Sequence, residues 1–146
     1  MWGAINFMGR SDLVQIEGRL NAERYVAEIV RPHVLPLLAA RGSIFQQDNA
    51  RPHVAQLTTQ FLADNNVQTI PWPAMSSDMN PIEHLWDELD RRLRQRDVAP
   101  ANLRQLSLAL REEWAAIPQQ QIQRLIGSMS RRCRSLIEAR GGHTPY

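Results

Sequence analysis

Apolar residues recur along the 146-residue chain with two spacings, and each spacing predicts one kind of secondary structure. Short apolar runs bounded by turn residues predict strands, which we place at 2–8, 13–17, 44–48 and 67–70. Apolar residues repeated every three or four positions predict helices, which we place at 21–41, 52–64, 81–96, 103–117 and 122–137. Strands interleaved with helices in this order indicate an α/β domain built on an open sheet.

Proline, asparagine and glycine mark where these elements are expected to bend, begin or end. Pro32 and Pro36 are expected to interrupt or kink the first helix, because proline removes a backbone donor and crowds the preceding turn. Asn21 and Asn80 stand where a helix N-cap is expected. Helix ends are predicted at glycines, namely Gly42 and Gly141-Gly142.

Two acidic residues stand at the joints of the predicted elements, with 34 residues between them. Asp48 ends the strand at 44–48, and Glu83 lies in the first turn of the helix at 81–96. A carboxylate at a strand end and another at a helix start can converge at one edge of an open α/β sheet, where such folds bind ligands. Magnesium prefers oxygen ligands, so the pair is a candidate cation site.

Each of these acids also has a plain structural interpretation. Asn80-Pro81-Ile82-Glu83 has the form of a capping box, in which the glutamate side chain bonds back to the backbone amide of the cap residue. Asp48, with Asn49 beside it, can equally serve the turn that follows a strand. The local pattern alone favours these structural roles.

Further candidates have the same ambiguity. His53 is either a ligand or phosphate contact, or a partly buried hydrogen-bonding residue near a helix start. Arg131, Arg132 and Arg134 either contact phosphate or form a solvated helix face. All seventeen basic residues are Arg and none is Lys, which suits phosphate binding but can equally reflect the base composition of the gene.

Composition excludes several other classes of protein. The single cysteine, Cys133, cannot form an intramolecular disulfide or a cysteine cage for zinc. The longest apolar run, at 34–40, is interrupted by Pro36 and is too short to span a bilayer, and no signal peptide is visible. We therefore expect a soluble, intracellular protein that does not enter membranes.

Two blocks of sequence, QQDNARPH and WPAMSSDMNPIEHLWDELDRR, closely resemble the catalytic core of Tc/mariner-type transposases, which are DDE-superfamily endonucleases of ribonuclease H-like fold. The end of the chain, SMSRRCRSLIEARGGHTPY, resembles the usual carboxyl terminus of that family. The spacing of 34 residues, with Glu as the third acid, is similar to the Tc branch. Small departures fall in the proline-rich loop, at Met75, Ser77 and Met79.

The resemblance implies a ribonuclease H-like mixed sheet flanked by helices, with a partial catalytic core at 1–98 and a helical extension of the same domain at 99–146. It implies that Asp48 and Glu83 are catalytic metal ligands for Mg²⁺ or Mn²⁺, two ions in the complete site. It also implies cleavage and strand transfer of DNA, with transposon ends and target DNA as partners, another transposase subunit as a further partner, and the nucleus as location. Candidate DNA contacts, or residues that support the metal ligands, are Asn49, His53, Asn80, Arg131, Arg132 and Arg134.

The family's first catalytic Asp lies on a strand upstream of the segment WGAI, whereas this chain begins at Met1-Trp2-Gly3. Asp12 does not correspond to it, because Asp12 lies in the predicted hairpin loop. We therefore expect a sheet without its first central strand and a chain that is inactive alone. The alternative is a non-catalytic remnant that binds nucleic acid or a transposase subunit.

Overall fold

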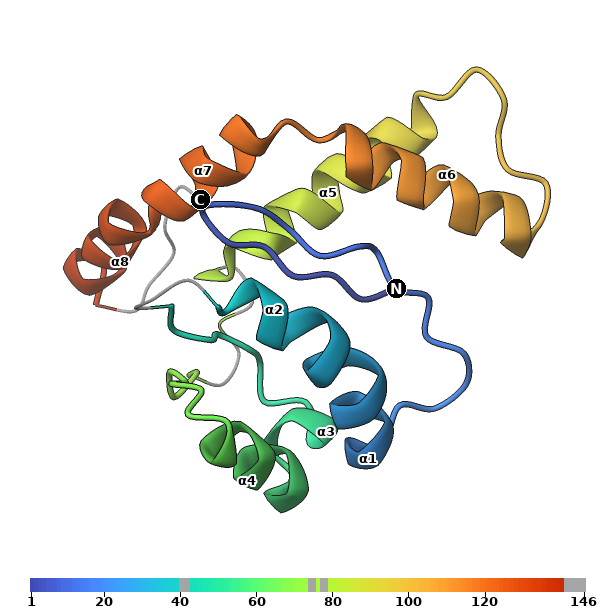
Figure 1. The fold of residues 1–146 in the computed structure, drawn as a ribbon. Helices are drawn as coiled ribbons and strands as arrows, with labels where there is room; N and C mark the ends of the chain where they lie inside the picture. The colour runs from blue at the N-terminus through green and yellow to red at the C-terminus, as the bar shows by residue number, and fades with distance from the viewer. Residues whose placement is uncertain (40–42, 74–75, 77–78, 141–146) are drawn as a thin grey trace. The chain divides into compact units, whose positions relative to one another are not determined.

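The structure is a computed structural model that describes residues 1–39, 43–73, 76 and 79–140. It divides into two compact units, each described by itself here (Figure 1). The first unit comprises Met1–Ala4 and Arg10–Ser76, and the second comprises Ile5–Gly9 and Ser77–Tyr146. The boundary predicted at 98/99 lies inside the second unit, and the assignment of both segments to one domain stays a prediction.

Helices dominate the first unit. They are α1 (Ala22–Arg24), the π-helix η1 (Tyr25–Val34), α2 (Leu35–Leu37), α3 (Arg51–Val54) and α4 (Gln56–Asp64). The predicted cap at Asn21 is confirmed, because its side-chain oxygen accepts a hydrogen bond from the backbone N–H of Arg24 at 2.9 Å. The first three helices follow one another without a gap, so they form one continuous helical segment (Figure 1).

Of the two effects predicted for Pro32 and Pro36, interruption of the helix is wrong, and a kink stays a prediction. Pro32 lies inside η1 and Pro36 inside α2. η1 has the wider π register, in which the backbone N–H of Leu35 donates to the carbonyl of Val30. Proline lacks a backbone N–H in either register, so the bonds made by the residues around Pro32 carry the helix past it.

The predicted helix at 52–64 is two helices, separated by an extended residue. Ala55 has φ −60° and ψ 142°, which ends α3 and begins α4. The hydroxyl of Thr58, a fully buried residue, donates to the carbonyl of Pro52 at 2.6 Å and so satisfies an acceptor at the break. Side-chain compensation of this kind allows a helix to change direction where periodicity alone predicts continuity.

The predicted mixed sheet is not formed by the residues that the structure describes. Where strands were expected, the described residues form isolated bridges, including an antiparallel one between Trp2 and Val14 and a parallel one between Phe45 and Thr69. The backbones of Trp2 and Val14 exchange two hydrogen bonds of 2.8 Å, and the N–H of Ser11 donates to the carbonyl of Ala4 at 2.8 Å, so the predicted hairpin partners do meet. A strand requires consecutive bridged pairs along both segments, whereas these bridges are isolated.

The core of the first unit lies along one side of η1. Its buried members are Tyr25, Ile29, Val30, Val34, Phe45 and Leu62. Partly buried residues from the amino-terminal hairpin, including Trp2 and Val14, pack against this cluster, as does Phe61 of α4. The helix and the two bridged pairs are therefore held together by one apolar cluster rather than by a sheet ladder.

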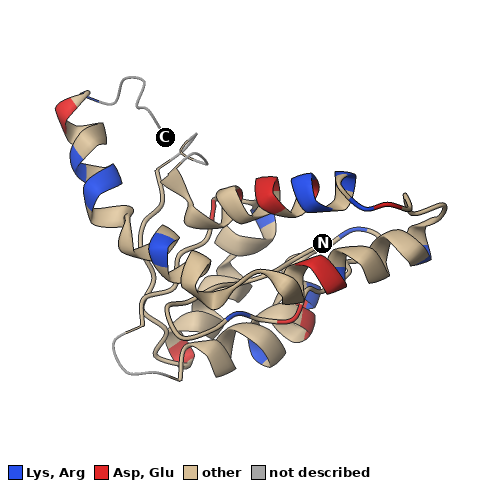
Figure 2. Ribbon diagram, turned by 90° about the horizontal axis from the view of Figure 1, so that it is seen from above, with Lys and Arg blue, Asp and Glu red and all other residues tan. Residues whose placement is uncertain are grey.

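The second unit contains α5 (Pro81–Arg94), α6 (Leu103–Ala116), α7 (Gln119–Gly127) and α8 (Met129–Glu138). Helix α5 contacts both α6 and α7. Trp86 of α5 stacks on Trp114 of α6 with 5.3 Å between ring centroids. Arg96, just after α5, bonds to Glu112 at 2.8 Å and to Glu113 at 2.7 Å, which joins the end of α5 to α6. Figure 2 shows basic turns toward the carboxyl end of α5, where Arg91, Arg92 and Arg94 lie in the last turn.

The last predicted helix is also two helices, and the face predicted for it is wrong beyond the break. The break comes at Gly127-Ser128, where the Ser128 hydroxyl donates to the carbonyl of Leu125 at 2.7 Å. The apolar spacing that predicts one helix at 122–137 includes Cys133 and Ile137, yet Cys133 is exposed and Ile137 is 74% exposed. Arg132 is buried instead, with 1% exposure, because the break changes the side of α8 that turns inward.

Some predictions fall outside the described residues. They are the helix ends at Gly42 and Gly141-Gly142 and the loop positions Met75 and Ser77. No helix within 1–39, 43–73, 76 and 79–140 is long and apolar enough to cross a membrane.

We expect Thr58→Val to lower the free energy of unfolding by about 1–2 kcal/mol, because it leaves the Pro52 carbonyl without its buried donor. Thr59→Val is the matched control, since Thr59 is exposed and its hydroxyl bonds only to carbonyls of the adjacent turn, those of Ala55 and Gln56. Urea unfolding of both variants measures the difference. Equal stability of the two variants would show that the bond at the helix break is dispensable.

Candidate functional site

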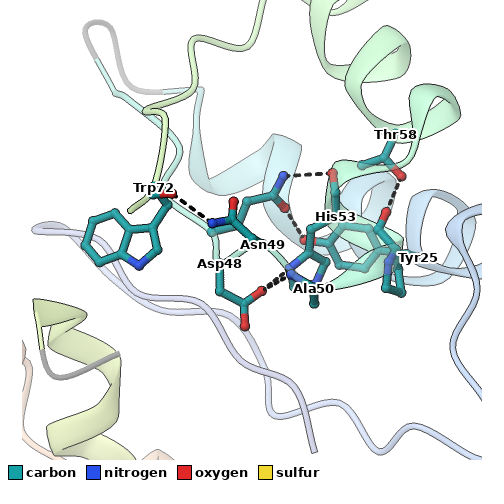
Figure 3. Close-up of polar contacts among 9 residues, drawn as sticks. Tyr25, Asp48, Asn49, Ala50, His53, Thr58 and Trp72 are labelled. Carbon is teal, nitrogen blue, oxygen red and sulfur yellow. Dashed lines mark hydrogen bonds and ion pairs between the residues drawn. The ribbon is translucent and has the colours of Figure 1, made fainter. Parts of the chain in front are cut away.

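Asp48 presents an exposed carboxylate on the segment that follows the Phe45 bridge. Its side chain is 61% exposed, yet one of its oxygens is held by two donors. Oδ1 accepts from the ring Nδ1 of His53 at 2.6 Å and from the backbone N–H of Ala50 at 3.0 Å (Figure 3). Both of the bonds that the structure describes for the Asp48 side chain involve Oδ1. Oδ2 is therefore the oxygen that can face a ligand.

His53, in α3, is a hydrogen-bond partner of Asp48. A carboxylate can only accept, so the bond requires the proton of the imidazole to be on Nδ1. The His53 side chain is 16% exposed, and its ring lies against the Tyr25 ring with 4.3 Å between centroids and 36° between planes. Of the alternatives left open by the sequence, this geometry favours the partly buried hydrogen-bonding role.

Tyr25 and Gln47 are parts of the site that sequence reasoning missed. The Tyr25 hydroxyl donates to Oε1 of Gln47 at 2.8 Å, and Nε2 of Gln47 donates to the backbone carbonyl of His53 at 3.3 Å. Burial, and then the negative charge of Asp48, raise the pKa of the Tyr25 phenol well above its usual value. The hydroxyl therefore stays protonated and remains a donor.

Asn49 ties the turn after Asp48 to the proline-flanked segment at 71–73. Its side-chain amide donates to the carbonyl of Trp72 at 2.8 Å (Figure 3). Asn49 is itself exposed, so this bond holds together two surface segments on the same side of the unit as the Asp48 turn. This bond joins Asn49 to a distant segment and not to its own turn, so its predicted roles at the turn and toward DNA stay predictions.

Glu83 and Asn80 belong to the second unit. Asn80 caps α5, since its side-chain oxygen accepts from the backbone N–H of Ile82 at 3.3 Å and its carbonyl accepts from the N–H of Glu83 at 3.1 Å. Glu83 is half-buried in the first turn, where a negative charge favours the helix dipole. Asp48 and Glu83 thus lie in different units, and their convergence on one cation stays a prediction.

The three candidate arginines of α8 do not share one surface. Arg131 and Arg134 are exposed, whereas Arg132 is buried and approaches the sulfur of Met129 at 4.0 Å. Figure 2 shows basic turns on α8. Only the first and third of these residues therefore present a charge to an external phosphate.

The donor chemistry of Asp48 fits a hard divalent cation, because it offers a carboxylate oxygen whose partner oxygen is fixed. Within the described parts of the chain, no group of three or more His, Cys, Asp or Glu side chains is gathered closely enough to hold a metal ion. Asp48 by itself is one ligand of a cation site and requires others to complete it.

Comparison with known proteins identifies relatives of the whole chain. The sequence model of the family described as DDE superfamily endonuclease matches residues 1–106. The chain is 37% identical over 151 residues to the Tc1 transposase of Caenorhabditis elegans and 35% identical over 150 residues to the Tcb1 transposase of Caenorhabditis briggsae. Both alignments cover 100% of this chain, which spans about half, 54%, of the length of either relative.

The fold is similar to that of a solved catalytic domain. The crystal structure of the catalytic domain of Mos1 mariner transposase superposes with a TM-score of 0.72 at 22% identity, over 87% of this chain and 65% of that one. Structures of the Mos1 catalytic domain with Mn and with Mg, and of Mos1 paired-end complexes, give similar superpositions. At this level of identity the likeness concerns the fold.

We expect the Tyr25 phenol to make stability fall at high pH. Its folded pKa is raised, so it contributes stability that is present below the unfolded pKa of about 10 and lost as pH rises above that value. The absence of Lys leaves few other groups that titrate in this range. Urea midpoints measured from pH 8 to 11 are expected to fall for the parent and to stay flatter for Tyr25→Phe, whereas parallel curves would contradict the assignment.

Proposed function

The chain belongs to the DDE superfamily of endonucleases and is a homologue of Tc1/mariner transposase catalytic domains, and from this premise we propose that it contributes to metal-dependent cleavage and strand transfer of DNA. The observation that carries the proposal is the arrangement at Asp48. The acid of the family's Asp-Asn-Ala block is exposed, while one of its oxygens is fixed by His53 and Ala50. This is the arrangement that a metal-binding carboxylate requires.

Asp48 and Glu83 are the proposed metal ligands. When bound between such carboxylates, two divalent cations activate the attacking water or 3′-hydroxyl and stabilise the leaving oxygen of a phosphodiester. Asp48 and Glu83 would hold such cations through their carboxylate oxygens. Glu83 can serve while its helix remains capped, because the N-cap role is filled by Asn80.

The proposed cofactor is Mg²⁺ or Mn²⁺, and the proposed partners are transposon ends, target DNA and a further transposase subunit. The metals present in the Mos1 structures and the transposon end in a Mos1 paired-end complex support these assignments. Because the proposed partner is DNA, the proposed location of the protein is the nucleus. The finer fold that we propose is a ribonuclease H-like sheet in which the Trp2–Val14 and Phe45–Thr69 bridges are the places where strands pair.

We propose that residues 1–146 alone bind one ion weakly and do not cleave DNA. Two divalent ions held a few ångströms apart repel each other, and a pair of carboxylates supplies less negative charge than the three acids of the family motif. Asp87, one turn beyond Glu83 and exposed, can approach one ion at most. Asp78 lies outside the described residues.

A second candidate function is DNA binding without catalysis. It is favoured by the exposed Arg131 and Arg134 on α8, which can contact phosphates without any metal. The pI of about 9.3 adds little to this argument, since the net charge is only +2. The two functions differ in what they require, because binding needs α8 and cleavage needs the carboxylates.

The proposed catalysis is tested on a labelled duplex carrying transposon ends, with Mg²⁺ or Mn²⁺. We expect no nicking by residues 1–146 and nicking by a longer chain in which an upstream segment restores the strand and its Asp. In that longer chain Glu83→Gln is expected to fold nearly as the parent but to lose cleavage, because the amide keeps the shape and lacks the charge.

The matched control for this substitution is Glu23→Gln, which also neutralises a glutamate in the first turn of a helix. It is expected to cleave as the parent does. Cleavage by Glu83→Gln at the parent's rate would leave that residue only a role at the helix start. Nicking by the short chain that disappears in Asp48→Ala would overturn the requirement for a third acid.

The second candidate function is tested by the salt dependence of duplex binding. We expect Arg131→Gln and Arg134→Gln each to reduce the slope of log K against log salt by about 0.9, the change for one lost phosphate contact on duplex DNA. Arg94→Gln is the control, since Arg94 is exposed on α5 and is paired with Asp90 at 2.8 Å. Identical slopes for all variants would exclude α8 from the DNA surface.

A further inference from the structure

We propose that Tyr25 and Gln47 are positioning residues that fix the Asp48 carboxylate through His53, so that Oδ2 of Asp48 faces the cation. The inference rests on the proposed function, because it takes Asp48 to be a metal ligand. It adds two residues outside the acidic motif, one of which lies in a helix that contains no ligand.

The exposed Asp48 side chain depends on few neighbours for its orientation. The backbone N–H of Ala50 fixes the position of Oδ1 but allows the carboxylate plane to turn about that bond. The second bond, from Nδ1 of His53 at 2.6 Å, adds a second direction and so determines where Oδ2 points. The orientation of the carboxylate is therefore only as well defined as the orientation of the His53 ring.

The His53 ring is fixed on its face by Tyr25. The two rings are 4.3 Å apart between centroids, with 36° between their planes, which is a packed aromatic pair. The ring edge bonds to Asp48 while the ring face rests on Tyr25. With only 16% of the side chain exposed, the imidazole has little space in which to rotate.

The backbone of His53 is fixed by the same tyrosine through Gln47. The Tyr25 hydroxyl directs Oε1 of Gln47, and this leaves Nε2 of the same amide pointing to the His53 carbonyl. One residue thus constrains both the ring and the main chain of the group that holds Asp48. Because Tyr25 is 1% exposed and belongs to the core cluster on η1, the rigidity of the core is passed to an exposed carboxylate.

Tyr25→Phe is the decisive variant, because it keeps the ring and removes only the hydroxyl. Metal binding is measured on the 146-residue chain from the electron paramagnetic resonance signal of free Mn²⁺, without any cleavage assay. We expect Tyr25→Phe and Gln47→Leu each to weaken Mn²⁺ binding by about tenfold, the lower end of what is lost when support of a ligand is removed. The double variant is expected to bind as either single variant does, since the two residues act in series.

A second readout follows the His53 ring itself and needs no metal. Long-range ¹H–¹⁵N spectra near pH 8 distinguish a proton on Nδ1 from one on Nε2. We expect the Nδ1–H form in the parent and a mixture with the Nε2–H form in Tyr25→Phe and Gln47→Leu. His53→Asn, whose amide can replace the Nδ1 donor, is expected to retain more Mn²⁺ affinity than His53→Leu.

Asn21→Ala is the control for lost stability, because it removes the cap of the helical segment that carries Tyr25 and touches neither Gln47 nor His53. It is expected to lower the unfolding midpoint and to leave both readouts at the parent's values. Unchanged Mn²⁺ affinity and an unchanged His53 spectrum in Tyr25→Phe would overturn the inference. Mn²⁺ binding that survives Asp48→Ala would instead refute the metal role of Asp48, and the His53 spectrum would still test whether Tyr25 orients the ring.

Discussion

The hydrogen bond between His53 and Asp48 is the contact on which the candidate site depends. It joins an exposed carboxylate to a side chain that is itself held by the core of the first unit. A surface aspartate is ordinarily free to change rotamer, and ordering it for a ligand costs conformational entropy. Here that cost is met during folding, when Tyr25 is buried, so the carboxylate is oriented before any cation arrives.

The π-helix makes this connection possible. Its buried residues, Tyr25, Val26, Ile29, Val30 and Val34, lie along one side of η1. The inward side of the helix therefore runs from the core cluster to the Asp48 turn, and Tyr25 lies at the end nearest the site. The helix also contains Pro32, which was expected to interrupt or kink it.

Local chemistry could be predicted from the sequence, and contacts between distant segments could not. The cap at Asn80 and the start of α5 at Pro81 follow from neighbouring residues, as does the cap at Asn21. The role of Tyr25 depends on a partner 22 positions away, and nothing in its helical spacing distinguishes it from an ordinary core residue. The only sign of this role in the sequence is that a tyrosine stands at a core position that an aliphatic residue could fill. Its buried hydroxyl needs a hydrogen-bond acceptor.

The errors have the same origin. Periodicity counts residues along one axis, so it predicts a single helix wherever the apolar spacing continues, and it passes over Ala55 and Gly127-Ser128. At both places a hydroxyl, from Thr58 or from Ser128, donates to a backbone carbonyl next to the break. After the second break the inward side of α8 changes, which buries Arg132 and exposes Ile137.

Asp48 and Glu83 are placed by different kinds of interaction, and this difference affects how each tolerates change. Glu83 owes its position to the start of a helix, which Asn80 and Pro81 define through adjacent residues. Asp48 owes its orientation to a histidine, a glutamine and a tyrosine from three segments that meet only in the folded unit. Substitutions in the core near Tyr25 can therefore change the orientation of the Asp48 carboxylate without contacting it. The position of Glu83 is affected mainly by substitutions in its own helical turn. Of the two proposed ligands, Asp48 is therefore the one whose orientation depends on the packing of the surrounding core.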